Sequence, residues 1–326
     1  MNDALKTVHI GMGTIGLEIV RAGARAGIAM PVACADISPE IAGRSLRAVA
    51  QDEDLPEMTV CARMDDALEA GREAGAEIAV VCTGSRVEMV EPQFTAVLER
   101  GMCCISTCEE LVFPWLRAAA AADRLDAVAV ENDVALLGGG VNPGFVLDLF
   151  PFVMTRVCQS VDAVYAGRFL DAARRRQQLQ AKIGSGMRPD GFREVASQGR
   201  IGHVGLAESA ALLADSLGWP WDEFEETIDP VIAEEPIETE YFEVAEGEVR
   251  GQHQTLTMGD VELELIMALG EDERDEVRVD GRPPVRVIVE GGIHGDTATA
   301  GAVINFMRPL VNAMPGVRTV TDVPLA

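Results

Sequence analysis

The first chemistry that the sequence offers is phosphate binding, in a glycine-rich stretch near the N-terminus. Gly11-Met12-Gly13-Thr14-Ile15-Gly16 follows the apolar run Val8–Ile10 and precedes a segment with helical periodicity. In such a strand–loop–helix unit the first glycine permits a tight turn, the second lets the backbone approach a pyrophosphate, and the third lets the helix pack against the strand. The free N–H groups at the helix N-terminus favour an anion. The stretch therefore predicts a dinucleotide-binding loop.

Asp36 lies twenty residues beyond Gly16, at the end of a second predicted strand, Val32–Ala35. A carboxylate at this position can accept hydrogen bonds from both ribose hydroxyls, and it repels a 2′-phosphate. Ser38 and Arg44 are close enough in sequence to soften that repulsion. We therefore expect Asp36 and Ser38 in the cofactor site, with NAD(H) preferred and NADP(H) as the second cofactor.

Two further segments end predicted buried strands, at the edge where ligands of a parallel sheet bind. Cys82, Thr83 and Gly84 end one strand, and their small side chains suit the rim of a cofactor cleft. Glu109 and Glu110 follow the next strand. A carboxylate there can act as a base or stabilise a developing cation such as an iminium. The alternative for a Glu-Glu pair is a solvated helix start, because Glu is favoured in a first turn.

Cys108 is a rival candidate beside these glutamates. A thiol near a cofactor can form a thiohemiacetal with an aldehyde, but two adjacent carboxylates raise the pKa of the thiol and oppose that role. The seven cysteines show no disulfide framework. Cys103, Cys104 and Cys108 are not followed by a second Cys or His pair at zinc spacing, so no metal is expected.

Length and composition set limits on the protein class. A chain of 326 residues favours two domains, and the net charge of −26 argues against nucleic acid as a partner. No apolar run is long enough for a membrane span. The N-terminal residues lack the pattern of a signal peptide. These features predict a cytoplasmic protein that binds neither membranes nor nucleic acid.

The hydrophobic pattern predicts an α/β fold with two domains. Residues 1–145 alternate strands and helices, which is typical of a Rossmann-type doubly wound parallel sheet. The expected strands are Val8–Ile10, Val32–Ala35, Ile78–Cys82, Cys103–Ser106 and Ala127–Val130, and the expected helices are Ile15–Arg25, one from about Pro39, Asp65–Ala74, Val87–Arg100 and Phe113–Arg124.

A change of pattern after Gly138-Gly139-Gly140 indicates a second, α+β domain over residues 146–296 with a mixed or antiparallel sheet. Its expected helices are Phe145–Met154, Ala173–Ile183 and Leu206–Leu217, and strands dominate from about Glu238 to Glu290. A last helix, Thr297–Ala313, is expected to pack back on the first domain with the rest of residues 297–326.

Several segments together resemble the 2,4-diaminopentanoate dehydrogenases and the related native NAD(P)-dependent amine dehydrogenases. Besides the glycine-rich loop, the matching segments are Ile105–Leu111, Gly139–Phe145, Asp171–Arg176 with Leu179–Gln180 and Lys182–Gly184, Gly202–Ser209, and Gly291–Thr299. The resemblance implies a dihydrodipicolinate-reductase-like fold and a homodimer, with the second domain binding substrate and forming the dimer. It also implies reversible oxidative deamination of a primary amine to a ketone or aldehyde, with 2,4-diaminopentanoate as one candidate substrate.

In that family a glutamate of the Ser-Thr-Cys-Glu-Glu segment is the catalytic acid/base. The resemblance assigns this role to Glu109, which lies nearer the strand end, with Glu110 as the alternative. Asn142 is expected at the nicotinamide, where an amide can both donate and accept; a turn role before Pro143 is the alternative. The residues expected to form the substrate pocket are Phe145, Arg168, Phe169, His203 and His294. Core packing for the phenylalanines and structural hydrogen bonds for the histidines are the alternatives.

Two other functions fit the same residues. The first is a carbonyl or semialdehyde dehydrogenase on this scaffold, which would oxidise NADH without ammonia. The second is a dinucleotide-sensing regulatory module without turnover, which would have no need for the glutamates at the strand end. Ammonia-dependent turnover of small ketones or aldehydes separates these from an amine dehydrogenase.

Overall fold

The computed structural model describes residues 4–175 and 177–325, which form two compact units. The first unit lies within Met1–Phe145 and His294–Ala326, and the second unit is Val146–Ile293. The chain thus passes out of the first unit after Phe145 and returns to it at His294.

The first unit is built on a parallel sheet of six strands in the order β14-β5-β4-β3-β1-β2. Its strands are β1 (Leu5–Ile10), β2 (Ala29–Ala35), β3 (Ile78–Val81), β4 (Cys103–Ser106), β5 (Ala135–Gly138) and β14 (Gly316–Arg318). The short strands β3, β4 and β5 are buried along their whole length. This is the continuous apolar pattern of a sheet that is covered on both faces. The prediction of a Rossmann-type doubly wound sheet is confirmed.

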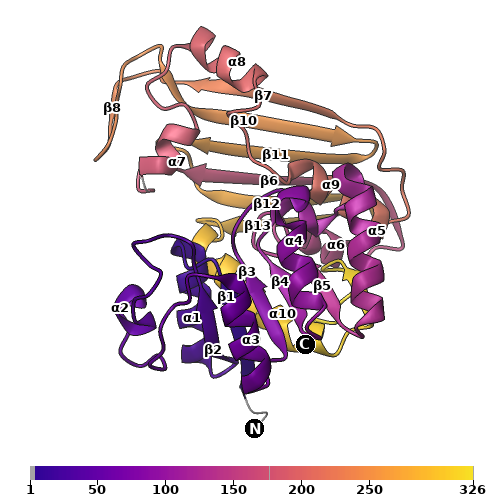
Figure 1. Cartoon of the computed structure of the whole chain (residues 1–326). Coiled ribbons are helices and arrows are strands. Elements are labelled where there is room, and N and C mark those ends of the chain that lie inside the picture. The colour runs from indigo at the N-terminus through magenta and orange to yellow at the C-terminus, as the bar shows by residue number, and fades with distance from the viewer. Residues whose placement is uncertain (1–3, 176, 326) are drawn as a thin grey trace. The chain divides into compact units, whose positions relative to one another are not determined.

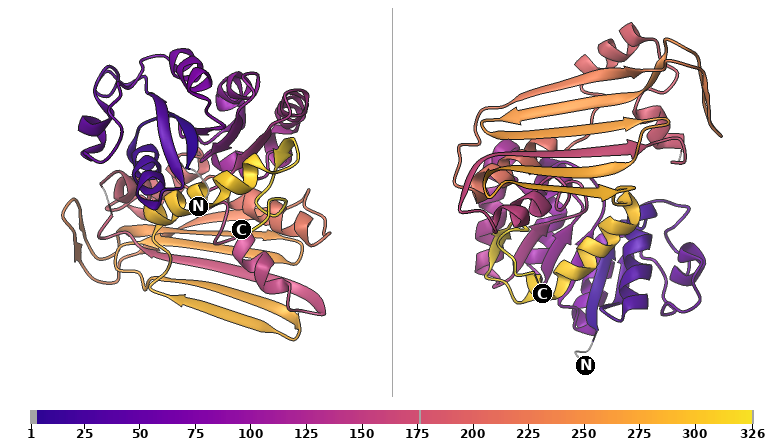
Figure 2. Two further views of the ribbon diagram at one scale, coloured as in Figure 1. Left: turned by 90° about the horizontal axis from the view of Figure 1, so that it is seen from below. Right: turned by 180° about the vertical axis from the view of Figure 1, so that it is seen from behind.

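Helices cover both faces of this sheet (Figures 1 and 2). Helices α1 (Thr14–Ala26) and α10 (Gly295–Val311) lie side by side on one face, and α3 (Met64–Ala74), α4 (Val87–Leu98) and α5 (Trp115–Glu131) lie on the other. The short α2 (Leu46–Ala50) follows β2, and a 3₁₀ turn, η1 (Glu109–Val112), follows β4. Strand order reverses at β1, whose neighbours are β2 and β3, and ligands of such sheets bind beyond the strand ends at that point.

Two expectations for the first unit are wrong. Ala127–Val130 is not a strand but the last part of α5, because Ala118, Ala122, Leu125 and Ala129 recur at helical spacing on its buried side. The strand at this place in the sheet is β5. The helix expected from about Pro39 is also wrong, since a turn over residues 39–43 precedes α2 and backbone N–H groups of Ile41 and Ala42 donate to the Ser38 carbonyl.

The second unit contains a mixed six-stranded sheet in the order β13-β12-β6-β11-β10-β7. Its strands are β6 (Ser160–Asp171), β7 (Glu225–Ile232), β10 (Val249–Met258), β11 (Val261–Ala268), β12 (Arg274–Arg282) and β13 (Val285–Glu290), with β8 (Ile237–Glu238) and β9 (Glu243–Val244) in a separate pair. The β6–β11 pair is parallel and the others are antiparallel. The prediction of an α+β unit with a mixed sheet is confirmed (Figure 1).

The helices of the second unit are α6 (Leu149–Thr155), α7 (Gln177–Lys182), α8 (Pro189–Ser197) and α9 (Leu206–Ser216). Several of these differ from expectation: α6 and α7 begin four residues later than predicted, at Leu149 and Gln177, and α8 was not predicted. The larger difference is β6, a twelve-residue strand within the sheet that was not expected. Its buried side includes Arg168, so a charged residue interrupts the apolar pattern that identifies a strand.

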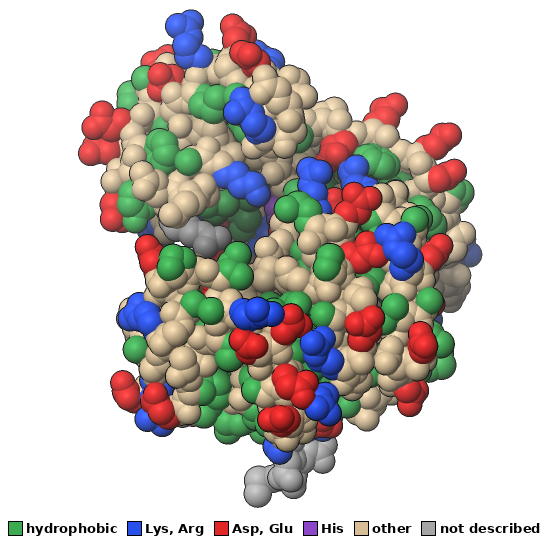
Figure 3. Space-filling view, in the orientation of Figure 1, with side chains coloured by type: hydrophobic (Ala, Val, Ile, Leu, Met, Phe, Trp, Pro, Cys, Tyr) green, Lys and Arg blue, Asp and Glu red, His purple; other side chains and the backbone are tan. Residues whose placement is uncertain are grey.

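Charge is spread over the surface. On the face shown in Figure 3, acidic and basic side chains are interspersed, although acids outnumber bases in the sequence. In the described part of the chain, no helix combines the length and the apolar character that crossing a membrane requires.

Candidate active site

The glycine-rich loop between β1 and α1 has the geometry that its three glycines predict. Gly11 has φ +88°, and a Cβ there would lie 2.5 Å from the Cys82 carbonyl oxygen. A Cβ on Gly16 would lie 2.0 Å from the Gly11 carbonyl oxygen, so only glycine lets α1 approach the loop this closely. Gly13, by contrast, has nothing within 4 Å of its Cβ position. Open space above Gly13 at the start of a helix fits a phosphate group.

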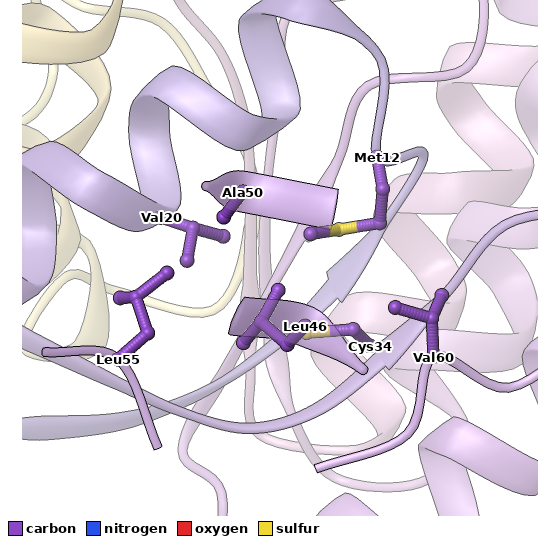
Figure 4. Packing of buried hydrophobic residues seen from close by; sticks show 7 residues of the cluster. All are labelled: Met12, Val20, Cys34, Leu46, Ala50, Leu55 and Val60. Atoms are coloured by element: carbon purple, nitrogen blue, oxygen red, sulfur yellow. The ribbon is translucent and has the colours of Figure 1, made fainter. Parts of the chain in front are cut away.

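Met12 anchors this loop to the core of the first unit. Its side chain is fully buried and lies in a cluster with Val20, Cys34, Leu46 and Val60 (Figure 4). The cluster joins α1, β2, α2 and the segment after α2, so the loop is fixed from below while Gly13 and Thr14 are exposed above it. Met12 was predicted as a cofactor-binding residue. Its side chain is buried in this core, so only its backbone is left to take part in the cofactor site.

Asp36 at the end of β2 connects the two sides of the predicted cofactor site. Its Oδ2 accepts a hydrogen bond from the Met12 N–H at 2.6 Å, and its Oδ1 accepts one from the Ser38 N–H at 2.7 Å. Ser38 itself starts the turn that leads to α2. Each carboxylate oxygen has a second lone pair, so Asp36 can accept further bonds from ribose hydroxyls.

A cavity of about 430 Å³ brings these elements together. It is lined by Ile10, Gly11, Gly13, Ala35, Asp36, Ile37, Ala62, Met64, Cys82, Thr83 and Gln93. Thr83 Oγ1 donates to Gln93 Oε1 at 2.7 Å at its rim. Five of the predicted cofactor residues line this cavity, namely Gly11, Gly13, Asp36, Cys82 and Thr83. The other predicted cofactor residues do not line it, namely Met12, Thr14, Ile15, Gly16, Ser38, Gly84 and Asn142. The combination of an open glycine, a carboxylate and an apolar wall fits a dinucleotide.

Sequence reasoning missed the apolar wall of this cavity. Ile37 is 93% exposed although it is a large aliphatic residue. Ala62 and Met64 line the same cavity; Ala62 lies just before α3, and Met64 is the first residue of that helix. An apolar residue directly after the ribose-binding acid was the available signal for Ile37; no local motif marks Ala62 or Met64.

The two glutamates after β4 have different surroundings. Glu110 Oε2 accepts the Val87 N–H at 2.9 Å, and the Glu110 N–H donates to the Ser85 carbonyl at 3.1 Å. Val87 is the first residue of α4, so the Glu110 carboxylate binds the N-terminus of that helix. Glu110 therefore has a structural role that accounts for its carboxylate.

Glu109 lies on the wall of a second cavity in the first unit, of about 140 Å³. This cavity is lined by Ile15, Thr107, Cys108, Glu109, Val112, Gly139, Gly140, Val141, Asn142, Pro143 and Thr299. It therefore brings together three predicted site residues, Ile15, Glu109 and Asn142. Among the described residues of this lining there is one carboxylate and no lysine or arginine. Such a site suits a neutral or cationic reacting group.

The positions of these walls follow from close backbone packing. A Cβ on Gly138, at the end of β5, would lie 2.4 Å from the Leu111 carbonyl carbon, so β5 presses directly against η1. The Gly139 N–H donates to the Ser106 carbonyl at 2.9 Å, and the Val141 N–H donates to Thr299 Oγ1 at 3.3 Å. Thr299 comes from α10 and was not predicted as a site residue, although its segment was one of those carrying the family resemblance.

Cys108 cannot compete with Glu109 as the reactive group. Its side chain is fully buried. Burial, together with the charges of Glu109 and Glu110, raises the pKa of the thiol to about 12. The thiol therefore stays protonated and is a poor nucleophile. Cys82, at the rim of the larger cavity, also has a pKa raised to about 11 by desolvation.

The five predicted substrate-pocket residues are divided between the two units. Phe145 ends the first segment of the first unit, and His294 caps α10, where its Nδ1 accepts the Thr297 N–H at 3.5 Å. Arg168 and Phe169 are buried in β6, and the Arg274 guanidinium lies 3.6 Å from the centroid of the Phe169 ring.

His203 lies in the second unit, where its backbone N–H and carbonyl both bind the Gln254 amide. Arg176, at the end of a matching segment, lies outside the described residues. For these residues the substrate contacts stay predictions.

Comparison with known proteins agrees with this architecture. A family model described as the 2,4-diaminopentanoate dehydrogenase C-terminal domain matches residues 145–326. The 2,4-diaminopentanoate dehydrogenase of Acetoanaerobium sticklandii is 26% identical over an alignment of 265 residues, and the match covers 78% of this chain and 75% of that protein. An amine dehydrogenase of Streptomyces virginiae is 22% identical over 230 residues, covering 62% of this chain and 64% of that protein.

A solved structure, the amine dehydrogenase from Mycobacterium smegmatis, shares the fold with a TM-score of 0.81 at 20% identity. The match covers 99% of this chain and 97% of that one. The family model covers more than half of the 326 residues. The chain therefore belongs to the 2,4-diaminopentanoate dehydrogenase family, and it is an oxidoreductase.

Proposed function

We propose that this enzyme is an NAD(P)-dependent amine dehydrogenase, which reversibly converts a primary amine into a small ketone or aldehyde and ammonia. The observation that carries the proposal is the position of Glu109. It is the one carboxylate among the residues lining the 140 Å³ cavity, beside Ile15 of the dinucleotide loop and Asn142. The names of the two curated relatives support amine chemistry.

Glu109 can move the protons that amine chemistry requires. In the amination direction, ammonia attacks the carbonyl carbon, and the C=O π electrons move to oxygen. The Glu109 carboxylate accepts a proton from the new ammonium group and passes it to the oxyanion, which gives a neutral carbinolamine. Glu109 then takes up a second proton from solvent and donates it to the hydroxyl, which leaves as water with the C–O bonding electrons. The carbon then carries an iminium, whose positive charge the regenerated carboxylate stabilises.

The cofactor would occupy the cavity above Gly13. The open Cβ position of Gly13 and the carboxylate of Asp36 fit a pyrophosphate and a ribose. When bound, the nicotinamide supplies hydride to the iminium carbon or accepts it from the amine. Asn142 offers an amide that can both donate to and accept from a carboxamide. Asp36 favours NAD(H), because a 2′-phosphate would lie against its negative charge.

The substrate class is proposed from the charges of the cavity lining. A carboxylate and no cation suit a substrate that is neutral or cationic at its reacting carbon. A carboxylate elsewhere on the substrate, as in 2,4-diaminopentanoate, would need a cation from another part of the chain. In Arg168 that charge is already compensated by Asp275, at 3.6 Å. This favours simple ketones and aldehydes over carboxylate-bearing ones.

The second unit is proposed to bind the substrate and to form a homodimer. Its sheet presents paired charges of both signs, such as His253 with Glu264 and Arg286 with Glu276. A surface with both signs can be complementary to its own copy. The oligomeric mass in solution tests this part of the proposal.

A substrate screen tests the proposed reaction. Small ketones and aldehydes, with and without a carboxylate, are offered with NADH or NADPH in the presence and absence of ammonium. We expect coenzyme oxidation that requires ammonium and is faster with NADH. Equal oxidation without ammonium would instead indicate a carbonyl or semialdehyde dehydrogenase. Tight NADH binding without any oxidation would indicate a sensing module.

A further inference from the structure

The chain returns from the second unit to the first unit at the peptide bond between Ile293 and His294. A buried ion pair, Arg168 with Asp275, forms hydrogen bonds with the backbone of Ile293. We infer that Arg168 and Asp275 are positioning residues for the reaction, because they fix the backbone at Ile293 and thereby the start of α10. The inference rests on the proposed function for its catalytic consequence. Its structural part can be tested without any turnover.

Arg168 and Asp275 each form a shorter contact with the backbone of Ile293 than with each other. Arg168 on β6 and Asp275 on β12 are directly opposite each other in the sheet, and their side chains are 1% and 0% exposed. Arg168 Nη2 donates to the Ile293 carbonyl at 2.5 Å, and the Ile293 N–H donates to Asp275 Oδ2 at 2.7 Å. In the described part of the chain, Arg168 Nη1 and Asp275 Oδ1 have no hydrogen-bond partner and lie 3.6 Å apart.

The two residues before Ile293 are glycines, which explains why the backbone at Ile293 needs to be fixed by side chains. Gly291 and Gly292 both have positive φ, at +73° and +62°, so the chain turns sharply after β13. Two consecutive glycines leave the backbone with much conformational freedom. The two bonds to Ile293 remove this freedom at the last residue before the first unit.

The residues after Ile293 lead along α10 to the cavity that Glu109 lines. His294 is the N-cap of α10, and its carbonyl accepts the Ala298 N–H. Thr299, within the second turn of α10, lines the cavity and accepts the Val141 N–H. Val141 and the next residue, Asn142, line the same cavity. We therefore expect a shift at Ile293 to be transmitted along α10 to residues that line the cavity together with Glu109.

The buried charges make this an unusual means of fixing a loop. Burial alone lowers the pKa of Arg168 and raises that of Asp275, while each charge opposes the effect on the other. Two apolar side chains would fill the same place without these costs, but they could not bind both the N–H and the carbonyl of Ile293. The retained polar pair is thus explained by the backbone that it binds.

The experiment compares two ion pairs of the second unit in which the arginine also donates to a backbone carbonyl, although the control pair is less deeply buried. In the matched control, Arg250 donates to the Leu269 carbonyl and to Glu271, away from Ile293. The test variants are Asp275→Ala, the conservative Asp275→Asn, and the neutral double variant Arg168→Met with Asp275→Leu, which leaves no unpaired buried charge if the single variant fails to fold. The control is Arg250→Met with Glu271→Leu.

Two readouts are taken on the full-length protein. Hydrogen–deuterium exchange of peptides covering 291–299 is expected to speed up by about tenfold or more in the Asp275→Ala and double variants, with partial recovery in Asp275→Asn. The kcat for the ammonium-dependent reaction is expected to fall by about tenfold or more, since small displacements in a reacting site are costly. The dissociation constant of NADH should change by less than about twofold.

Each outcome decides one part of the inference. Unchanged exchange at 291–299, or an equal change in the control variant, would overturn the positioning role altogether. Faster exchange with unchanged kcat would leave a structural anchor and overturn the link to catalysis. If the wild-type protein shows no ammonium-dependent turnover, the proposed function fails, and the exchange data still decide whether the pair fixes the start of α10.

Discussion

The carboxyl ends of β2 and β4 both present acidic residues to the same edge of one sheet, but they use them differently. At the end of β2, Asp36 binds the N–H groups of Met12 and Ser38 and so shapes the loop around the dinucleotide site. At the end of β4 the two adjacent glutamates have different environments. Glu110 binds the N-terminus of α4, whereas Glu109 lines the cavity beside Asn142.

The difference shows how adjacent acids can be assigned different roles. A carboxylate that accepts backbone N–H groups stabilises the local structure. A carboxylate on a cavity wall can exchange protons with a substrate that enters the cavity. We therefore propose Glu109 rather than Glu110 as the acid/base, and the assignment stays a prediction to be tested.

The largest effect is expected for Glu109→Gln. The amide keeps the shape of the side chain but cannot accept a proton, and it cannot stabilise an iminium by its charge. We expect kcat for amination to fall by about 10²–10³-fold, as when other preorganised electrostatic groups are removed. The dissociation constant of NADH, measured by fluorescence titration, should stay within about twofold. Near-wild-type kcat would move the catalytic role to another residue.

A smaller effect is expected for Asp36→Ala, at the other strand end. Loss of charged hydrogen bonds to the ribose should weaken NADH binding by about ten- to a hundredfold, since such bonds contribute about 1.5–3 kcal/mol each. NADPH should lose less, because the repulsion of its 2′-phosphate disappears. The ratio of kcat/KM for the two coenzymes measures this. A ratio identical to that of the wild type would contradict the role of Asp36.

Strand β1 lies between β4 and β2 in the sheet, and it carries a buried base, His9, whose pKa is shifted by the fold. Its ring is buried, and desolvation lowers its pKa from 6.5 to about 3. The unfolded chain therefore binds a proton between these values while the folded chain does not. Stability should fall as the pH drops below about 6.5, by up to about 1.4 kcal/mol per pH unit from this residue.

Urea unfolding near about pH 7.5 and about pH 5.5 measures this dependence, with His9→Gln as the comparison. The variant should lose less stability than the wild type on acidification. The sign is opposite for His253, whose pKa is raised by its hydrogen bond to Glu264. Its contribution is present at acid pH and is lost as the pH rises through its folded-state pKa. Equal losses in the wild type and His9→Gln would show that His9 does not titrate as expected.

The smallest effect is expected for Glu110→Gln, the matched control for Glu109→Gln. Gln keeps an acceptor for the Val87 N–H but removes the negative charge from the N-terminus of α4. Stability should fall by about 0.3–1 kcal/mol, measured by thermal unfolding, with kcat unchanged within about twofold. A loss of kcat similar to that of Glu109→Gln would erase the distinction between the two strand ends.

The features predicted well from the sequence are those that depend on neighbouring residues. The glycine-rich loop, Asp36 and the strand end at Glu109 follow from motifs of a few residues, and the structure places Gly11, Gly13 and Asp36 around one cavity. The α/β class and the mixed second sheet follow from strand and helix periodicity. The choice between the two glutamates depended on Val87, which is 23 residues from Glu110.

The features that sequence reasoning missed depend on residues far apart in the chain. Strand β6 was not predicted, because the buried Arg168 is stabilised by Asp275 from another strand. Ala127–Val130 was predicted as a strand because alanines and valines alternate there. The same residues also fit a helix that buries small side chains, and they form the last part of α5. Thr299 reaches the Glu109 cavity from the end of the chain, and no local pattern places it there.

The central claim is that Glu109 supports the incorporation of ammonia, and isotope transfer tests it most directly. A ketone or aldehyde accepted by the enzyme is incubated with NADH and ¹⁵N-labelled ammonium, and the product is identified by mass spectrometry. Our account predicts a ¹⁵N-labelled primary amine from the wild type and from Glu110→Gln, with almost none from Glu109→Gln. An unlabelled alcohol as the product, or equal labelling by Glu109→Gln, would contradict it.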